Sequence, residues 1–117
     1  MQKVIKIDGK DVGFRASALT PRLYRIRIGR DMIVDMNRLK KNYEKVGDDP
    51  EARLSVTDLT IFENSAYVMA KHYDDNIPDT PDEWLDTFEM FSIYEVMPHI
   101  LELWKLNQAT TAIPKKK

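Results

Sequence analysis

The sequence predicts a mainly α-helical domain of the α+β class, in which an N-terminal β-hairpin precedes about five helical segments in a small bundle. Two observations predict this fold. An Asp-Gly turn separates two short alternating runs near the N-terminus, and apolar residues then recur at spacings of three and four to about residue 106. Because the chain has 117 residues, 43% of them hydrophobic, we expect one globular domain over residues 1–106 with one modest core.

The segment 4–17 is predicted to form the β-hairpin. A short apolar run from Val4 to Ile7 precedes a turn that carries Asp8 and Gly9, and a second alternating run follows it. This arrangement is a strong local signal for two antiparallel strands. Since two strands alone are marginally stable in water, we expect the hairpin to pack on a helix or to pair with the edge of another chain.

The segment 20–106 is predicted to be helical. Thr20 can cap a first helix that has Pro21 at its first position, and Gly29 interrupts that helix. Two longer helices follow, separated by a break at 47–50 that contains Gly and Pro. Their apolar stripes are Met32, Met36, Leu39, Tyr43 and Val46, and then Leu59, Phe62, Ala66, Met69 and Tyr73.

Two capping-box patterns mark the last helical segments. In the first, the hydroxyl of Thr80 can accept from the backbone of Glu83, and the Glu83 carboxylate can reach back to the Thr80 amide. The second opens a last helix at Ser92, and Pro98 inside that helix predicts either a kink or a later start. The polar residues 107–117 are expected to form a disordered C-terminal tail.

Composition argues against several classes of function. The chain has no cysteine, a formal charge of −1, and no apolar stretch approaching the ~20 residues that span a bilayer. We therefore expect a cytoplasmic protein that binds neither membranes nor nucleic acid. His72 and His99 have no partners at catalytic or metal-ligand spacing, and no phosphate-binding glycine motif occurs. The sequence thus predicts that the protein is not an enzyme and has no catalytic residues, no metal site and no cofactor.

Charged residues of opposite sign are separated along the chain. Arginines precede any acid between residues 15 and 30, and carboxylates cluster without a lysine or arginine in 74–89. The acidic stretch lacks the pattern of a calcium loop, and acids are common in loops and first helical turns. We hypothesise that the two groups face each other, within one molecule or between subunits. The groups are Arg15, Arg22, Arg25, Arg27 and Arg30, and Asp74, Asp75, Asp79, Asp82, Glu83, Asp86 and Glu89.

The junction between the last two helical segments is more apolar than a loop requires. Met90 and Phe91 lie there, between Phe88 and Ile93. Two interpretations remain open for this junction. It is either a corner that fills the core or a partly exposed docking surface, since methionine and aromatic residues suit adaptable binding faces.

Six segments, taken in order, carry a family resemblance. They are Phe14-Arg15-Ala16, Thr20-Pro21-Arg22-Leu23-Tyr24-Arg25, Gly29-Arg30-Asp31, Phe62-Glu63-Asn64-Ser65-Ala66-Tyr67-Val68-Met69-Ala70, Asp82-Glu83-Trp84-Leu85-Asp86-Thr87-Phe88 and Leu101-Glu102-Leu103-Trp104. Together they resemble the tail assembly chaperone family of long-tailed, siphovirus-type phages and prophages of Gram-positive bacteria. The likeness runs from about Val4 to the C-terminus with nearly no gap.

The resemblance implies a protein that binds the long tape measure protein, keeps its apolar helical surface soluble and helps recruit tail tube subunits. Such a protein acts in the cytoplasm of the bacterial host and is absent from the mature virion. The resemblance also implies a longer form, made by a programmed ribosomal frameshift, that chiefly contacts the tail tube protein. Lysine codons at 115–117 can form the slippery run that such a frameshift requires. Whether the chain forms a homo-oligomer stays open.

These patterns give two sets of candidate partner-binding residues. The apolar set, expected to contact the client, is Trp84, Phe88, Met90 and Phe91. The charged set is Arg22, Arg25, Arg27 and Arg30. The alternative function is a structural tail or head-completion protein that is retained in the virion.

Overall fold

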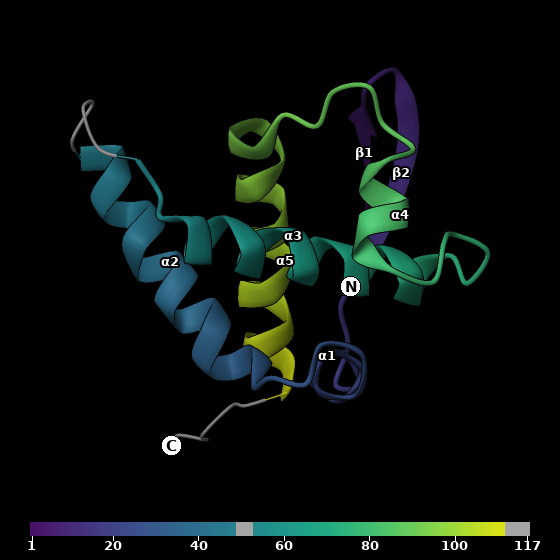
Figure 1. Cartoon of the computed structure of the whole chain (residues 1–117). Helices are drawn as coiled ribbons and strands as arrows, with labels where there is room; N and C mark the ends of the chain where they lie inside the picture. The colour runs from purple at the N-terminus through teal and green to yellow at the C-terminus, as the bar shows by residue number, and fades with distance from the viewer. Residues whose placement is uncertain (49–52, 112–117) are drawn as a thin grey trace.

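A two-stranded hairpin and five helices make up the computed structural model, which describes residues 1–48 and 53–111 (Figure 1). This architecture confirms the predicted fold class. The helix α3 crosses the middle of the molecule and contacts β2, α1, α2, α4 and α5. The elements are β1 (Gln2–Ile7), β2 (Lys10–Arg15), α1 (Thr20–Ile28), α2 (Met32–Asp48), α3 (Val56–Tyr73), α4 (Pro81–Leu85) and α5 (Ile93–Thr111).

The strands β1 and β2 pair antiparallel in a register that ends with Ile7 opposite Lys10. The turn residues Asp8 and Gly9 have φ values of 55° and 75°, which are the left-handed values that a two-residue type I′ turn requires. Ile7 and Phe14 are buried, because the hairpin packs against α3 and α5. The hairpin therefore gains its stability from helices of its own chain, which is one of the two arrangements expected.

The helix α1 ends as predicted but begins differently. Gly29 has a φ of 79° and its amide donates to the Arg25 carbonyl at 2.9 Å, which is the usual geometry of a glycine that ends a helix. Thr20 is not the cap, because Leu19 occupies that position without a side-chain bond. The Thr20 hydroxyl instead accepts from the Ser17 amide at 2.8 Å, so it stabilises the turn before the helix.

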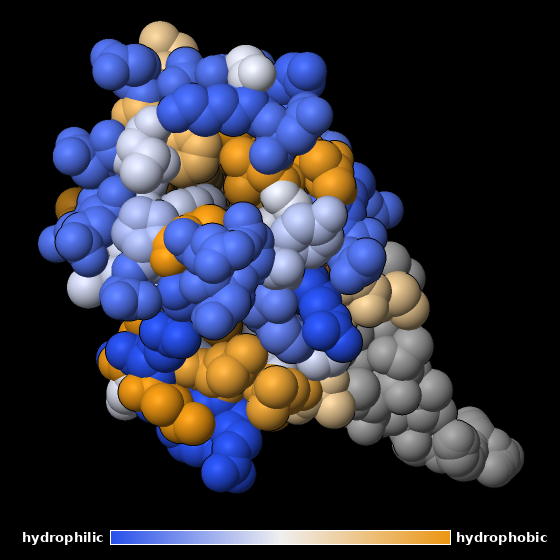
Figure 2. Space-filling model, turned by 90° about the vertical axis from the view of Figure 1, so that its right-hand side faces the viewer, coloured by the Kyte–Doolittle hydropathy of each residue, from blue (hydrophilic) through white to orange (hydrophobic). Residues whose placement is uncertain are grey.

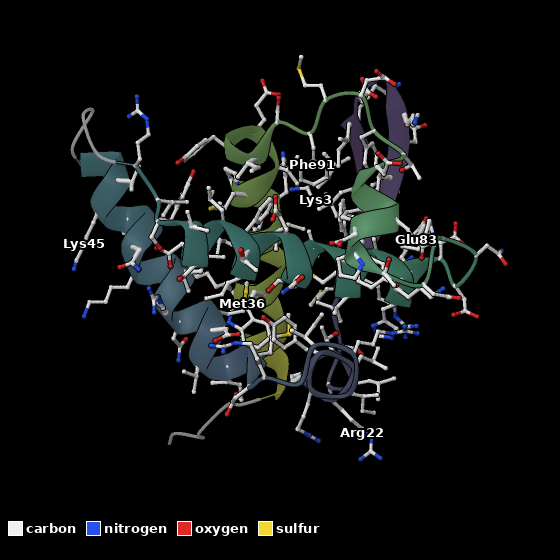
Figure 3. All side chains as sticks on the ribbon, in the orientation of Figure 1. Lys3, Arg22, Met36, Lys45, Glu83 and Phe91 are labelled. Carbon is white, nitrogen blue, oxygen red and sulfur yellow. The ribbon has the colours of Figure 1, made fainter. Side chains whose placement is uncertain are left out.

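The stripe predicted for α2 faces the core. Met32, Met36 and Leu39 are all buried, and Figure 3 shows Met36 pointing from α2 into the interior. The carboxylate of Asp31 accepts from the Ile33 amide at 2.9 Å and so satisfies one of the free donors at the start of this helix.

Burial in α3 extends beyond its predicted stripe. Ile61, Tyr67 and Val68 are buried together with the predicted Phe62, Ala66 and Met69, because neighbouring elements enclose this helix on most sides. Tyr73 departs from the prediction, since it is 42% exposed. Its ring lies over Gly13 of β2, where an added Cβ would come within 2.0 Å of a ring carbon. Glycine at position 13 therefore leaves the space that the Tyr73 ring occupies.

The capping box of α4 is present with one change. The Thr80 hydroxyl accepts from the Glu83 amide at 3.2 Å, as predicted, but the Glu83 carboxylate accepts from that hydroxyl at 3.0 Å instead of from the Thr80 amide.

The helix α5 begins at Ile93 and continues through Pro98, which excludes the later start. It also runs to Thr111, so residues 107–111 of the expected tail are helical, since no proline or glycine lies between Pro98 and Pro114. Residues 112–117 lie outside the described part.

A buried lysine organises the connection from α3 to α4. The side chain of Lys71 is 6% exposed, and its ammonium donates to the carbonyls of Asp75 and Ile77, both at 2.8 Å. Its third donor reaches the carboxylate of Asp79 at 3.0 Å. Because an ammonium has three donors and all three are used here, the buried charge is fully hydrogen-bonded.

Two buried carboxylates hold α2 in place, one at its start and one at its middle. Asp35 accepts two bonds of 2.7 Å from Arg30 and one of 2.9 Å from the Tyr24 hydroxyl. The Arg30 bonds lower the pKa of Asp35 below its usual value, although burial acts in the opposite direction. This pair ties the connection between α1 and α2 to the core.

The second carboxylate, Asp58, joins the start of α3 to the middle of α2. It accepts from Asn42 at 3.0 and 3.1 Å, from the Ser55 hydroxyl at 2.9 Å and from Arg38 at 3.3 Å. Burial by itself would raise the pKa of Asp58, but these hydrogen bonds outweigh it and the pKa lies below its usual value.

The substitution Lys71→Met tests the role of the buried ammonium. We expect the free energy of unfolding to fall by about 2 kcal/mol, because the carbonyls of Asp75 and Ile77 lose their partner inside the protein. Urea unfolding measures this change. The control, Lys45→Met at an exposed position of α2, should change it by less than about 0.5 kcal/mol. Equal effects of the two substitutions would contradict the role given to Lys71.

The pKa shifts of Asp35 and Asp58 predict sensitivity to acid. Their folded-state pKa values lie below the unfolded value of about 3.9, so their stabilisation is complete above that pH. It is lost as the pH falls below about 4 towards the folded values. We expect the double variant Asp35→Asn/Asp58→Asn to be less stable at pH 7 and to lose less stability on acidification. The exposed Asp86→Asn should keep the acid sensitivity of the original chain.

Candidate binding surfaces

Trp84 lies at the centre of an aromatic cluster and not at the surface. It is 2% exposed, and its ring centroid lies 5.3 Å from that of Phe88 and 5.6 Å from that of Phe91. Phe14 approaches it from β2 at 6.4 Å, and Tyr67 approaches it from α3 at 5.9 Å. The structure thus corrects the expectation that Trp84 contacts a client. The apolar side of α4 faces α3 and the hairpin, and the indole fills the space between them.

Residues 86–92, which we call the corner, connect α4 to α5. Phe88 and Phe91 are half-buried with their centroids 5.4 Å apart, and Figure 3 shows Phe91 between α4 and the start of α5. Met90 differs from both, because it is 69% exposed. Each of the two interpretations therefore fits part of the corner: the phenyl rings extend the core, and Met90 is available to a partner.

The turn of the hairpin holds the corner in place. The Glu89 amide donates to the Asp8 carboxylate at 2.9 Å, and the ammonium of Lys10 donates to the Thr87 carbonyl. The same ammonium lies 5.3 Å from the centroid of the Phe88 ring, within the range of a cation–π interaction. These contacts join residues that are about eighty positions apart in the sequence, so the conformation of the corner depends on the hairpin.

Two hollows border the corner. One, of about 300 Å³, lies between β1 and the start of α5, with Met90 in its lining. The other, of about 330 Å³, lies beside β2, with Phe88 in its lining. The apolar side chains that complete their walls are Ile5, Ile7 and Val96 in the first hollow, and Val12, Ala70, Tyr73, Ile77, Pro78 and Trp84 in the second.

The arginines of the charged set have two different environments. Arg22, Arg25 and Arg27 are exposed on α1, and Figure 3 shows Arg22 pointing away from the fold. Arg30 is bound to the buried Asp35 through two hydrogen bonds. Arg30 thus has a structural bond to Asp35, but its side chain is still 57% exposed, so all four arginines of the charged set reach the surface.

An apolar stripe that sequence reasoning missed lies between these arginines. Leu19, Leu23 and Ile26 are spaced four and three apart, so they share one side of α1, with Arg22 and Arg27 on its two borders. Leu19 is 45% and Ile26 is 67% exposed. Figure 2 shows an orange patch in the lower part of the molecule, at the height of α1, with hydrophilic side chains around it. The spacing of these three residues in the sequence could have predicted the stripe. However, the same spacing occurs in buried and in exposed stripes, so it does not distinguish them.

The acidic residues after α3 are largely exposed. The side chains of Asp75 and Asp79 are 94% and 88% exposed, and both lie near the ammonium of Lys71. Within residues 1–48 and 53–111, no ion pair joins Arg22, Arg25 or Arg27 to a carboxylate. The idea that the basic and acidic groups pair inside one molecule thus has no support from the described contacts.

One histidine, His72, lies partly buried beside α1. Burial lowers the pKa of His72, whose Nδ1 lies 3.5 Å from the Thr20 hydroxyl. In the part of the chain that the structure describes, no three His, Asp or Glu side chains gather as metal ligands would. Among the same residues, no helix combines the length and hydropathy needed to cross a membrane.

Comparisons with protein-family models, with curated proteins and with solved structures find no match to this chain.

Paired substitutions separate the structural from the exposed residues of the apolar set. We expect Trp84→Ala to lower the free energy of unfolding by about 3–5 kcal/mol, because it empties the centre of the aromatic cluster. Met90→Ala should change it by less than about 0.5 kcal/mol, because the side chain is exposed. Thermal or urea unfolding measures both values. A strongly destabilising Met90→Ala would show that Met90 has a structural role.

Proposed function

We propose that this chain is a tail assembly chaperone of a long-tailed phage or prophage. It binds the tape measure protein during tail assembly, keeps that protein soluble and helps recruit tail tube subunits, chiefly through a frameshifted longer form. Its place of action is the cytoplasm of the bacterial host, and it is left out of the mature virion. The observation that carries the proposal beyond the sequence resemblance is the corner, where Met90 is exposed beside a hollow lined by both apolar and polar side chains.

The corner suits a helical apolar client. An amphipathic helix binds by placing apolar side chains in a groove, and the hollow beside Met90 offers Ile5, Ile7 and Val96 as walls. Methionine adapts to varied partners because its side chain is unbranched and polarisable. This adaptability suits a client with a long apolar helical surface.

Charged side chains at the rim favour a reversible complex. Lys6, Asp8 and Glu95 also line the hollow beside Met90, so the apolar contact is small and is surrounded by hydrated groups. A chaperone that must be displaced by tail tube subunits requires such a limited contact. The hairpin turn already holds the corner in one conformation. Client binding therefore does not have to order a loop, and the entropy cost of binding is lower.

Co-expression with the tape measure protein encoded just downstream tests the proposal. We expect the two proteins to co-purify by tag pull-down and the tape measure protein to become soluble. Met90→Asp should lower the co-purified fraction by about tenfold, which corresponds to about 1.4 kcal/mol. The matched control is Val56→Asp, which places the same charge at an apolar position that is 80% exposed at the start of α3.

Three results would count against the proposal. The first is a tape measure protein that stays insoluble and unbound beside the original chain. The second is equal loss of binding with Met90→Asp and Val56→Asp, which would move the client site away from the corner. The third is the presence of the chain in purified particles, which would favour a structural tail or head-completion protein.

A further inference from the structure

We infer that the chain forms a twofold-symmetric dimer in which the basic α1 of each copy lies against the acidic loop of the other. The acidic loop is defined here as residues 74–82, from the end of α3 to the first turn of α4. The inference concerns a second copy of this chain and does not depend on the proposed client.

The basic helix and the acidic loop are neighbours on one face. A hollow of about 210 Å³ is lined from α1 by Leu19, Leu23 and Arg27, and from the acidic loop by Asp75. Figure 2 looks onto this face from the right-hand side of Figure 1, where the loop after α3 projects. Opposite charges are therefore placed side by side on one surface of the molecule.

Within the described residues, the arginines of α1 are not neutralised, and the acidic loop is neutralised only in part, by Lys71. Arg22, Arg25 and Arg27 form no ion pair there. Asp75 and Asp79 share the single ammonium of Lys71, whose three donors are already occupied. Both carboxylates remain almost fully exposed, so each patch keeps most of its electrostatic attraction for an opposite charge.

Adjacent patches of opposite charge are self-complementary under a twofold rotation. Rotating a second copy about an axis between the patches places its acidic loop over the first copy's α1 and its own α1 over the first acidic loop. The interface is then isologous, so each contact occurs twice and the assembly closes as a dimer.

The apolar stripe of α1 supplies the centre of this interface. Leu19 and Ile26 are 45% and 67% exposed, and they lie between the borders formed by Arg22 and Arg27. Specific interfaces commonly have an apolar centre and a charged rim, and this face has that arrangement. The dimer therefore covers a stripe that the folded monomer leaves in contact with water.

Sedimentation velocity of the full chain tests the dimer. We expect a dimer at about 0.05 M salt that dissociates towards monomer at about 1 M, because screening weakens exposed charge pairs. Arg22→Glu/Arg27→Glu and Asp75→Lys/Asp82→Lys should each weaken self-association by at least about tenfold, since like charges then face each other. An equimolar mixture of the two variants should restore the dimer, because both contacts of the mixed dimer join opposite charges.

The control is Lys41→Glu/Lys45→Glu, which makes the same change in charge on the exposed side of α2. It should remain dimeric, and thermal unfolding of all three variants checks that they are folded. Three outcomes would overturn the inference: a monomer at every concentration and salt level, a dimer unaffected by the charge reversals, or variants that do not recombine. Client binding at the corner is scored separately by pull-down, so each proposal can fail without the other.

Discussion

The helix α3 is enclosed by its neighbours, and its burial determines where the other elements lie. The other helices and β2 each cover part of this helix, and its residues are buried over most of its circumference (Figure 1). Its only buried cation, Lys71, lies near its last turn, where it fixes the acidic loop through carbonyls that would otherwise lack donors. At its first turn Asp58 fixes α2 in a similar way. A central helix with charged anchors near both ends thus sets the positions of the surfaces that remain exposed.

Those surfaces lie at opposite ends of the molecule, and the fold explains why. The corner lies beside the hairpin turn, because Asp8 and Lys10 bind the backbone of residues 87 and 89. The α1 stripe lies at the other end, below α3 in Figure 1, because Tyr24 turns the opposite side of α1 into the core. A protein with two separate surfaces can hold a client with one and a second copy with the other. This division suits an assembly protein that acts in several copies along a long rod.

Local patterns predicted the local structure well, because their causes are local. The turn was predictable from Asp8 and Gly9, because both residues tolerate a positive φ. The start of α4 was predictable from Thr80, because its hydroxyl can cap the helix. Contacts between distant segments were not predictable in this way. The same spacing describes the buried stripe of α2 and the exposed stripe at Leu19, Leu23 and Ile26. A helix as short as α4 does not reveal that Trp84 faces inward, and no sequence pattern predicts the hydrogen bond between Asp8 and Glu89.

Hydrogen exchange of the chain, alone and in complex with the tape measure protein, tests the central claim that the corner is the client surface. At constant protein concentration and salt, we expect slower exchange over residues 86–92 and β1 in the complex, with exchange in α1 unchanged. Unchanged exchange over residues 86–92, together with slower exchange in another segment, would contradict a client site at the corner and place the client elsewhere.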